Sequence, residues 1–243
     1  MRYVAAGALL QILLLSACGN QPDPAPVAPD ASAAPAATAA ADGRATPAPT
    51  ASVSGESRLV LAFGDSLYAG YGLERGQSLP DAVQARLRKQ GIDATVVNAG
   101  VSGDTTAAGR RRLAFALDNL PRTPDLVLLG LGGNDVLRQI TPSETRANMV
   151  AMLDELRKRK IPVLLTGMQA PPNLGPDYVK AINGLWPDLA AKYDAGLYPF
   201  ILDGVIGDRK LMLPDSVHPN AVGVNRIADR LAPLVAEQLG TTS

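Results

Sequence analysis

Short runs of apolar residues that do not alternate with polar ones are the feature that most restricts the fold of this chain. They span residues 59–63, 95–97, 126–129, 163–165 and, less clearly, 198–201. Strands with this composition are buried on both faces, as in a parallel sheet that is covered by helices on each side. The chain from Arg58 onward is therefore expected to contain a parallel β-sheet.

Helical patterns lie between these runs. One follows Thr141 and Pro142, a pair that suits a helix cap and a first-turn proline. Apolar residues recur at helical spacing at Met149, Met152, Leu153 and Leu156, at Leu79, Val83 and Leu87, and at Ile227, Leu231, Leu234 and Val235. Pro233 is expected to kink or interrupt the last of these helices. Alternation of strand and helix predicts a three-layer α/β/α domain with right-handed crossovers.

The first residues of the chain resemble a bacterial lipoprotein signal. Arg2 precedes an apolar run at residues 4–15, which is too short to span a bilayer and is typical of an export signal at residues 1–17. The run ends in Leu-Ser-Ala-Cys at residues 15–18, and the resemblance implies that lipid is attached to the thiol of Cys18. The alternative is an ordinary signal peptide with a chance cysteine. Cys18 is the only cysteine, so an intramolecular disulfide is excluded.

Composition divides the rest of the chain into a tether and one domain. Residues 19–57 are dominated by Ala, Pro, Ser and Thr, which predicts a tether at residues 18–57 and a folded domain at residues 58–243. Lys plus Arg equals Asp plus Glu at 23 each, so no overall field favours nucleic acid as a partner. The basic run at residues 110–112 is interpreted as a solvated helix face beside an apolar stripe at Leu113 and Leu117.

Polar motifs follow three of the predicted strands directly. Ser66 stands in Gly-Asp-Ser-Leu at residues 64–67, Gly103 lies in the loop after the second strand, and Asn134 stands in Gly-Gly-Asn-Asp at residues 132–135. Ligands of α/β folds bind where loops leave the carboxyl ends of the strands. Each motif alone also fits an ordinary turn. Together they would bring a hydroxyl, unhindered backbone N–H groups and an amide to one edge, as an oxyanion site requires.

Three aspartates stand in the same loops. Asp65, Asp104 and Asp135 would repel a phosphate that no metal bridges, which argues against a phosphate-binding loop. They leave a Mg²⁺ site as an alternative, but capping and bracing of loops is the commoner use of aspartate at such positions. No metal is expected.

His218 is the only histidine of the chain, in Asp-Ser-Val-His-Pro-Asn at residues 215–220. Pro219 suits the first position of the last helix and so keeps the imidazole in the preceding loop. Asp215, three residues earlier, can reach back to the ring, fix its tautomer and stabilise the imidazolium. A lone histidine is more often a bystander. Its place in a fourth loop at the same sheet edge favours a base beside a nucleophile.

These blocks resemble the signature of the SGNH (GDSL) hydrolase family. They are Gly64-Asp65-Ser66-Leu67, Gly103 within residues 101–105, Gly132-Gly133-Asn134-Asp135 and Asp215-x-x-His218. Residues 95–106 and 177–200 are similar to the branch that contains arylesterases, acyl-CoA thioesterase I and lysophospholipase L1. The proline-rich loop at residues 171–173 lies where this branch varies and where the acyl chain is expected, so it leaves the substrate open.

The resemblance implies a flavodoxin-like five-stranded sheet, no cofactor and hydrolysis of esters or thioesters through an acyl-serine. Carried over by position, Ser66 is the nucleophile, His218 is the general base and then the acid, and Asp215 orients His218. The backbone N–H groups of Ser66 and Gly103, with the side-chain amide of Asn134, would form the oxyanion hole.

The sequence therefore predicts a lipid-anchored esterase of the bacterial envelope that faces the periplasm and acts on a small acyl ester or a lysophospholipid. The resemblance to lipoprotein signals also implies that Gly19, rather than Asp, after Cys18 favours the outer membrane over the inner one. An esterase that removes acetyl groups from envelope sugars and a non-catalytic binding lipoprotein remain alternatives. The oligomeric state is left open.

Overall fold

A computed structural model describes residues 56–240 of the chain. The expected signal segment, Cys18 and nearly all of the expected tether lie outside the described residues, so those interpretations stay predictions. No helix within residues 56–240 is both long enough and apolar enough to cross a membrane.

The described residues form one five-stranded parallel sheet in the order β2-β1-β3-β4-β5. The strands are β1 (Arg58–Gly64), β2 (Ala94–Gly100), β3 (Leu126–Gly130), β4 (Val163–Thr166) and β5 (Gly196–Tyr198). The five-stranded parallel sheet is confirmed, and four strands contain the predicted runs. The fifth run is misplaced, because β5 pairs with β4 through residues 196–198 and ends where Pro199 has no N–H for the ladder.

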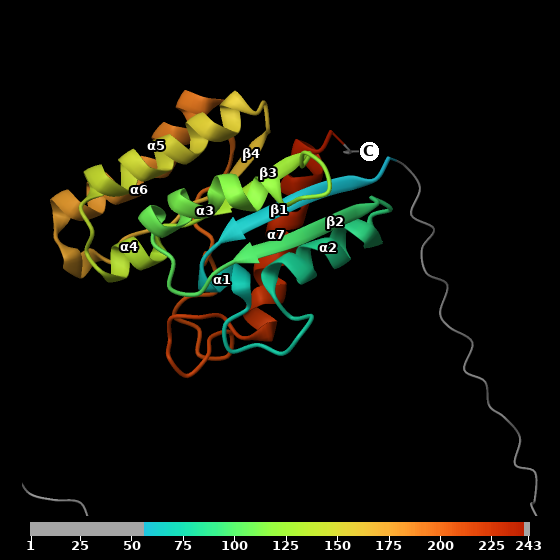
Figure 1. The fold of residues 1–243 in the computed structure, drawn as a ribbon. Helices are drawn as coiled ribbons and strands as arrows, with labels where there is room; N and C mark the ends of the chain where they lie inside the picture. The colour runs from blue at the N-terminus through green and yellow to red at the C-terminus, as the bar shows by residue number, and fades with distance from the viewer. Residues whose placement is uncertain (1–55, 241–243) are drawn as a thin grey trace, which may run out of the picture. The chain divides into compact units, whose positions relative to one another are not determined.

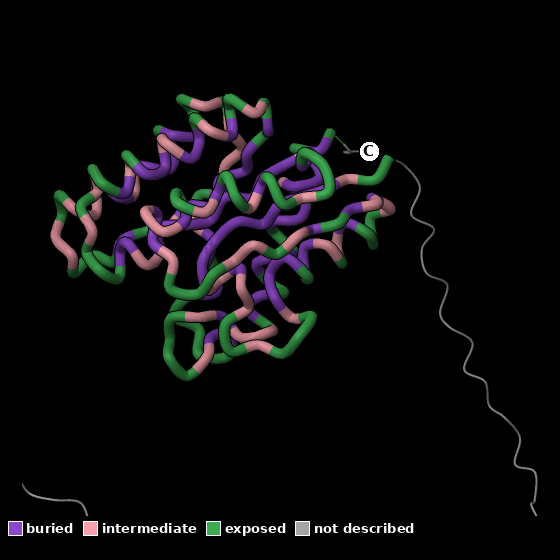
Figure 2. Tube along the Cα trace, viewed as in Figure 1, coloured by how far each residue is buried: buried purple, intermediate pink, exposed green. Residues whose placement is uncertain are grey.

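Helices cover both faces of the sheet (Figure 1). One layer consists of α2 (Leu79–Lys89) and α7 (Ala221–Gln238), and the other of α3 (Thr106–Asp118), α5 (Pro142–Lys158) and α6 (Pro176–Tyr193). The short elements α1 (Ser66–Ala69), α4 (Gly133–Leu137) and η1 (Pro172–Leu174) lie in the loops between them. Burial is concentrated in the strands and on the helix faces that meet them (Figure 2). The three-layer α/β/α prediction is confirmed.

Strand β1 shows why its apolar run has no alternation. Val60 and Ala62 pack with α2 and α7 on one face, whereas Leu61 and Phe63 pack with α3, α5 and α6 on the other. Every residue from 59 to 64 is buried. Because both faces are covered, neither face has a place for polar side chains.

The predicted cap holds at α5, whereas Pro233 does not interrupt α7, which was one of the two effects expected of it. The Thr141 side chain accepts a hydrogen bond from the Glu144 N–H, and Pro142 opens the first turn of α5. Helix α7 continues through Pro233 to Gln238. Pro233 is exposed, so its ring needs no space in the core, and buried neighbours on the opposite face hold the segment against the sheet.

Glycines end three adjacent strands at one level. Gly64 of β1 is in register with Gly100 of β2 and Gly130 of β3. A Cβ on Gly100 would lie 2.3 Å from the backbone nitrogen of Ala69, and one on Gly130 would lie 2.3 Å from the Tyr68 ring. The missing side chains therefore let α1 sit against the carboxyl edge of the sheet, and this placement positions Ser66, its first residue.

Candidate active site

Ser66, His218 and Asp215 form one chain of hydrogen bonds. The Nε2 atom of His218 lies 2.8 Å from Ser66 Oγ, and its Nδ1 atom lies 2.7 Å from Asp215 Oδ2. An ionised carboxylate can only accept, so Nδ1 carries the proton and Nε2 accepts from the serine hydroxyl. The geometry is that of a nucleophile, a base and an orienting carboxylate.

The turn that carries Asp215 is closed by its own carboxylate. Asp215 Oδ1 accepts the backbone N–H groups of Val217 at 2.9 Å and His218 at 3.0 Å. Burial by itself would raise the pKa of Asp215, but these donors and the imidazole together lower this pKa to about 2. Asp215 therefore stays ionised beside the ring. Tyr71 packs against the imidazole, with 4.5 Å between the ring centroids.

Pro219 does not occupy the predicted first helical position. Helix α7 begins at Ala221, and Asn220 caps it by accepting two N–H groups of the first turn with its side chain. Asparagine at the cap satisfies these donors, as proline cannot. Pro219 instead forms a bridge with Met212, which still leaves His218 in the loop.

The three predicted oxyanion donors lie on the wall of one cleft with His218. Ser66 begins α1, Gly103 follows β2 with a φ of 86°, and Asn134 is in the first turn of α4. The Asn134 Nδ2 atom donates one hydrogen bond to the backbone oxygen of Asp104 at 3.0 Å. An amide nitrogen has two hydrogens, so a second donor remains for a ligand.

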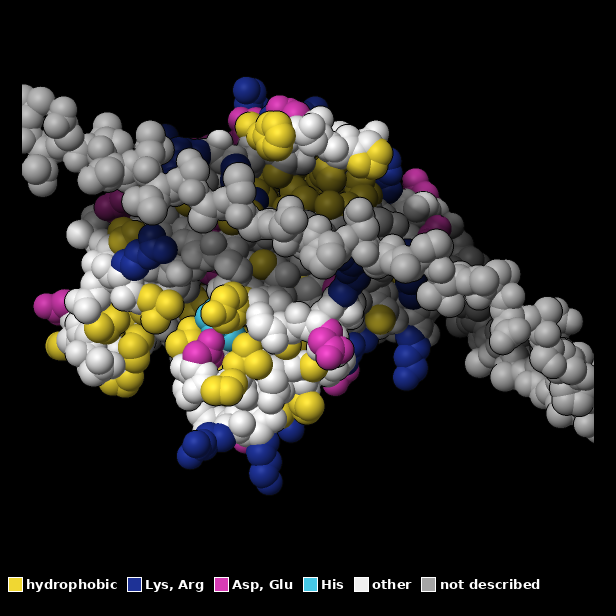
Figure 3. Space-filling model, turned by 60° about the horizontal axis from the view of Figure 1, so that its bottom comes forward, with side chains coloured by type: hydrophobic (Ala, Val, Ile, Leu, Met, Phe, Trp, Pro, Cys, Tyr) yellow, Lys and Arg dark blue, Asp and Glu magenta, His cyan; other side chains and the backbone are white. Residues whose placement is uncertain are grey.

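The cleft has a volume of about 770 Å³, a size common for small-molecule sites. Its lining is largely apolar and includes Met168, Pro171, Leu174, Phe200 and Ile206. Figure 3 shows hydrophobic side chains gathered around the histidine. The loop at residues 171–173 lines the cleft, as expected for a segment that contacts the acyl part of a substrate.

The aspartates of the motifs brace the loops. Asp135 is fully buried and accepts hydrogen bonds from the Thr106 N–H and from the hydroxyls of Thr106 and Thr145. Asp65 caps α1 by accepting from the Leu67 N–H. Within residues 56–240, no cluster of three or more His, Cys, Asp or Glu side chains is arranged to hold a metal ion. The expected bracing role is confirmed for both residues.

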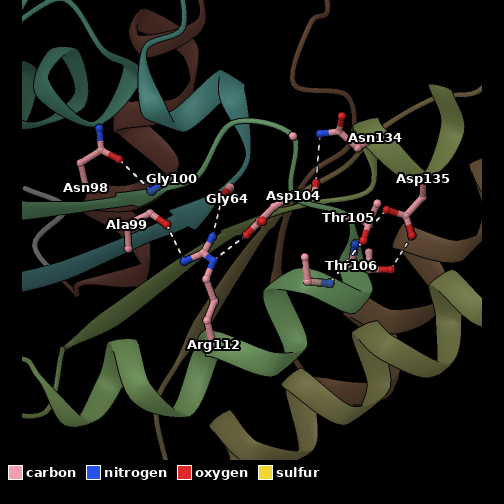
Figure 4. A network of polar contacts seen from close by, with 12 residues as sticks. Gly64, Asn98, Ala99, Gly100, Asp104, Thr105, Thr106, Arg112, Asn134 and Asp135 are labelled. Atoms are coloured by element: carbon pink, nitrogen blue, oxygen red, sulfur yellow. Dashed lines mark hydrogen bonds and ion pairs between the residues drawn. The ribbon is translucent and has the colours of Figure 1, made fainter. Parts of the chain in front are cut away.

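Arg112 is not part of a solvated face, which corrects the prediction for residues 110–112. Arg110 and Arg111 are exposed, but the Arg112 guanidinium reaches under the motif loops to Asp104 and two backbone oxygens (Figure 4). Position 112 follows the buried Gly109 by three residues and so borders the buried side of α3. That spacing is the only sequence signal for its inward direction.

Asp65 is buried in an environment that disfavours its charge. Desolvation is the largest cause that raises the pKa of Asp65, and the nearby Asp104 and Asp135 add to it. The Leu67 N–H and His218 act in the opposite sense, and the pKa rises from 3.8 to about 6. The folded state therefore favours the neutral carboxyl between these two values.

The Asp65 shift predicts a pH dependence of stability. Because the folded-state pKa is raised, the stability that the neutral Asp65 carboxyl contributes is fully present below pH 4 and is lost as the pH rises through about 6. The Asp65→Asn variant keeps the acceptor for Leu67 and cannot ionise. The free energy of unfolding of this variant, relative to the unsubstituted protein, should rise by about 2–3 kcal/mol between pH 4 and pH 8 in urea titrations.

The exposed Asp177 offers a control, because Asp177→Asn also removes one carboxylate. Its stability should follow that of the unsubstituted protein across the same pH range. Parallel curves for Asp65→Asn and the unsubstituted protein would show that Asp65 is not destabilised by burial.

Comparison with known proteins agrees with this geometry. The sequence profile of the GDSL-like Lipase/Acylhydrolase family matches residues 62–226. Esterase TesA of Pseudomonas aeruginosa is 38% identical over 177 residues, which cover 73% of this chain and 87% of that protein. Thioesterase 1/protease 1/lysophospholipase L1 of Escherichia coli (strain K12) is 34% identical over 180 residues, 72% of this chain and 84% of that protein.

Comparison with a solved structure shows that the fold is shared as well. The SGNH-hydrolase family esterase AlinE4 is 52% identical, with a TM-score of 0.65 over 76% of this chain and 97% of that one. The profile match runs from the end of β1 into α7, and so includes the three motif loops that follow β1, β2 and β3 as well as Asp215 and His218. The chain therefore belongs to the GDSL-like lipase/acylhydrolase family, the SGNH hydrolases, in the branch of esterase TesA, arylesterase and thioesterase 1/lysophospholipase L1, and is a carboxylic ester hydrolase.

Proposed function

We propose that this protein is a serine esterase that hydrolyses short to medium acyl esters or thioesters through an acyl intermediate on Ser66. The observation that carries the proposal is the hydrogen-bonded chain from Ser66 through His218 to Asp215, on the wall of an apolar cleft. A binding module has no need of this arrangement, whereas nucleophilic catalysis requires it.

Acylation starts when the Ser66 oxygen attacks the ester carbonyl and its proton passes to His218 Nε2. The ionised Asp215 stabilises the imidazolium and holds the ring in place. The carbonyl oxygen becomes an oxyanion, which accepts from the backbone N–H groups of Ser66 and Gly103 and from the Asn134 amide. His218 then protonates the leaving alcohol or thiol, and a water molecule deacylates Ser66 by the same route.

The lining of the cleft supports a neutral acyl group as its occupant. Of the residues within 56–240 that line it, none is Lys or Arg, and the titratable ones are Asp65, Tyr71 and His218. A phosphate or carboxylate inside the cleft would therefore lack a cationic partner. A lysophospholipid, a substrate type that the name of the Escherichia coli relative includes, would place its headgroup phosphate outside.

Hydrolysis of p-nitrophenyl acetate, butyrate, octanoate and palmitate tests the proposal, with Ser66→Ala as the background. We expect kcat/KM to be highest for butyrate or octanoate, because they fill more apolar wall than acetate does. Palmitoyl thioester and lysophospholipid are assayed in parallel. Activity on none of these, with release of acetate from acetylated envelope glycans, would instead support a carbohydrate acetyl-esterase.

We also propose that the protein is anchored through lipid on Cys18 in the bacterial envelope, facing the periplasm, and more specifically in the outer membrane. The support is the sequence of residues 1–19. Recovery of a Cys18→Ala variant in the membrane fraction to the same extent as the unsubstituted chain would contradict this anchor.

A further inference from the structure

The guanidinium of Arg112 contacts the ends of β1 and β2, the two strands that lead into the loops of Ser66 and Gly103. Its Nη2 atom donates to the Gly64 oxygen at 2.8 Å, at the end of β1 and two residues before Ser66. Its Nη1 atom donates to the Ala99 oxygen at 2.8 Å, near the end of β2. One side chain of α3 thus ties the two strand ends together (Figure 4).

The third contact of Arg112 is to the loop of Gly103. Its Nε atom lies 2.6 Å from Asp104 Oδ2, and the two side chains are 23% and 14% exposed. Because both side chains are largely buried, salt screens this charge-assisted ion pair only weakly. The guanidinium also lies over the ring of the buried Phe63, 3.9 Å from its centroid. The planar group is therefore held on several sides.

Asp104 connects Arg112 to Asn134 through hydrogen bonds. The Asp104 side chain is held by Arg112, while its backbone oxygen accepts from Asn134 Nδ2 at 3.0 Å. The neighbouring Gly103 oxygen accepts from Arg138 Nη2 at 2.9 Å. Two of the three proposed oxyanion donors therefore adjoin Asp104, the residue that Arg112 holds: the Gly103 N–H lies in the residue before it, and the Asn134 amide is bound to its backbone oxygen.

We propose that Arg112 is a positioning residue of the oxyanion hole, which holds Asp104 so that the Gly103 N–H before it and the Asn134 amide bound to it both face the substrate oxygen. The inference rests on the proposed function. Arg112 touches no substrate and acts through Asp104. Stabilisation of an oxyanion depends on donors that are fixed before the reaction, and small displacements of such groups lower the rate strongly.

The test compares Arg112→Met and Arg112→Lys with Arg111→Met, a control at the exposed neighbour on the same helix. For p-nitrophenyl butyrate, we expect Arg112→Met to lower kcat by about 10- to 100-fold with KM within about threefold, because substrate binding is not its task. Arg112→Lys should be intermediate, since one ammonium can keep the contact to Asp104 but not the whole fork. Arg111→Met should be unchanged.

A double-mutant cycle separates positioning from a general structural role. In an Asn134→Ala background, Arg112→Met should lower kcat by a smaller factor than it does in the unsubstituted protein, because one of the two donors that it positions is already absent. Active-site titration with a p-nitrophenyl phosphonate counts the folded enzyme, so loss of folded protein is not mistaken for loss of kcat. If Arg112→Met does not fold, Arg112→Lys carries the same cycle.

The outcomes distinguish the inference from the proposed function. Ester hydrolysis by the unsubstituted protein together with an unchanged kcat in Arg112→Met, a loss confined to KM, or a full loss on top of Asn134→Ala would overturn the positioning role alone. Absence of hydrolysis by the unsubstituted protein on every ester would overturn the proposed function, and the positioning role with it.

Discussion

Replacing Ser66 or His218 by alanine is expected to lower kcat for p-nitrophenyl butyrate by roughly 10³- to 10⁶-fold. Ser66 Oγ and His218 Nε2 are 2.8 Å apart, and no other histidine in the chain could take the proton. Without the hydroxyl no acyl-enzyme forms, and without the imidazole the hydroxyl is a weak nucleophile. The measurement is steady-state hydrolysis of the ester by variants purified from a host that lacks background esterases.

The two residues act as one unit, so their effects should not add. The Ser66→Ala/His218→Ala double variant should be no slower than the slower single variant within error. Ser143→Ala, at an exposed serine of α5, is the matched control and should keep the full rate. A Ser66→Ala enzyme that retains its activity and still forms an acyl adduct would place the nucleophile elsewhere.

The fold could be predicted because burial of a parallel sheet on both faces leaves apolar runs that no other arrangement explains as simply. An apolar run predicts a strand less well where the strand is only partly buried. Strand β5 has three residues at the edge of the sheet, and only Tyr198 among them is buried, so its run blends into the following turn. The break expected at Pro233 has a related cause, since the sequence does not show that Pro233 is exposed while one face of α7 is buried.

The convergence of the proposed catalytic groups could be predicted because each follows a strand or precedes the last helix, and the carboxyl ends of parallel strands share one edge. Arg112 could not. Two of its contacts are to the backbone oxygens of Gly64 and Ala99, and any residue in those places would offer the same atom. Its third contact is to Asp104, which lies eight residues earlier and before the start of α3. No sequence pattern at this spacing predicts an ion pair.

Removing the Asn134 amide by substitution with alanine is expected to lower kcat by about 100- to 1000-fold while KM changes little. One hydrogen of Nδ2 is used on the Asp104 oxygen at 3.0 Å, and the other is available where charge develops on the carbonyl oxygen. The ground-state carbonyl gains less from this donor than the oxyanion does, so the loss appears in kcat. The measurement is kcat and KM on p-nitrophenyl butyrate.

Two further variants sharpen the assignment of this amide. Asn134→Asp keeps the shape but replaces the donor with a negative charge, so it should lose at least as much as Asn134→Ala. Asn173→Ala removes a different amide from the wall of the same cleft and should leave kcat within a few-fold of the unsubstituted value, because its loop is expected to contact the acyl chain and not the oxyanion. If Asn134→Ala instead hydrolyses the ester at the unsubstituted rate, then the backbone N–H groups of Ser66 and Gly103 suffice for the oxyanion, and the link from Arg112 through Asp104 to this amide has no catalytic consequence.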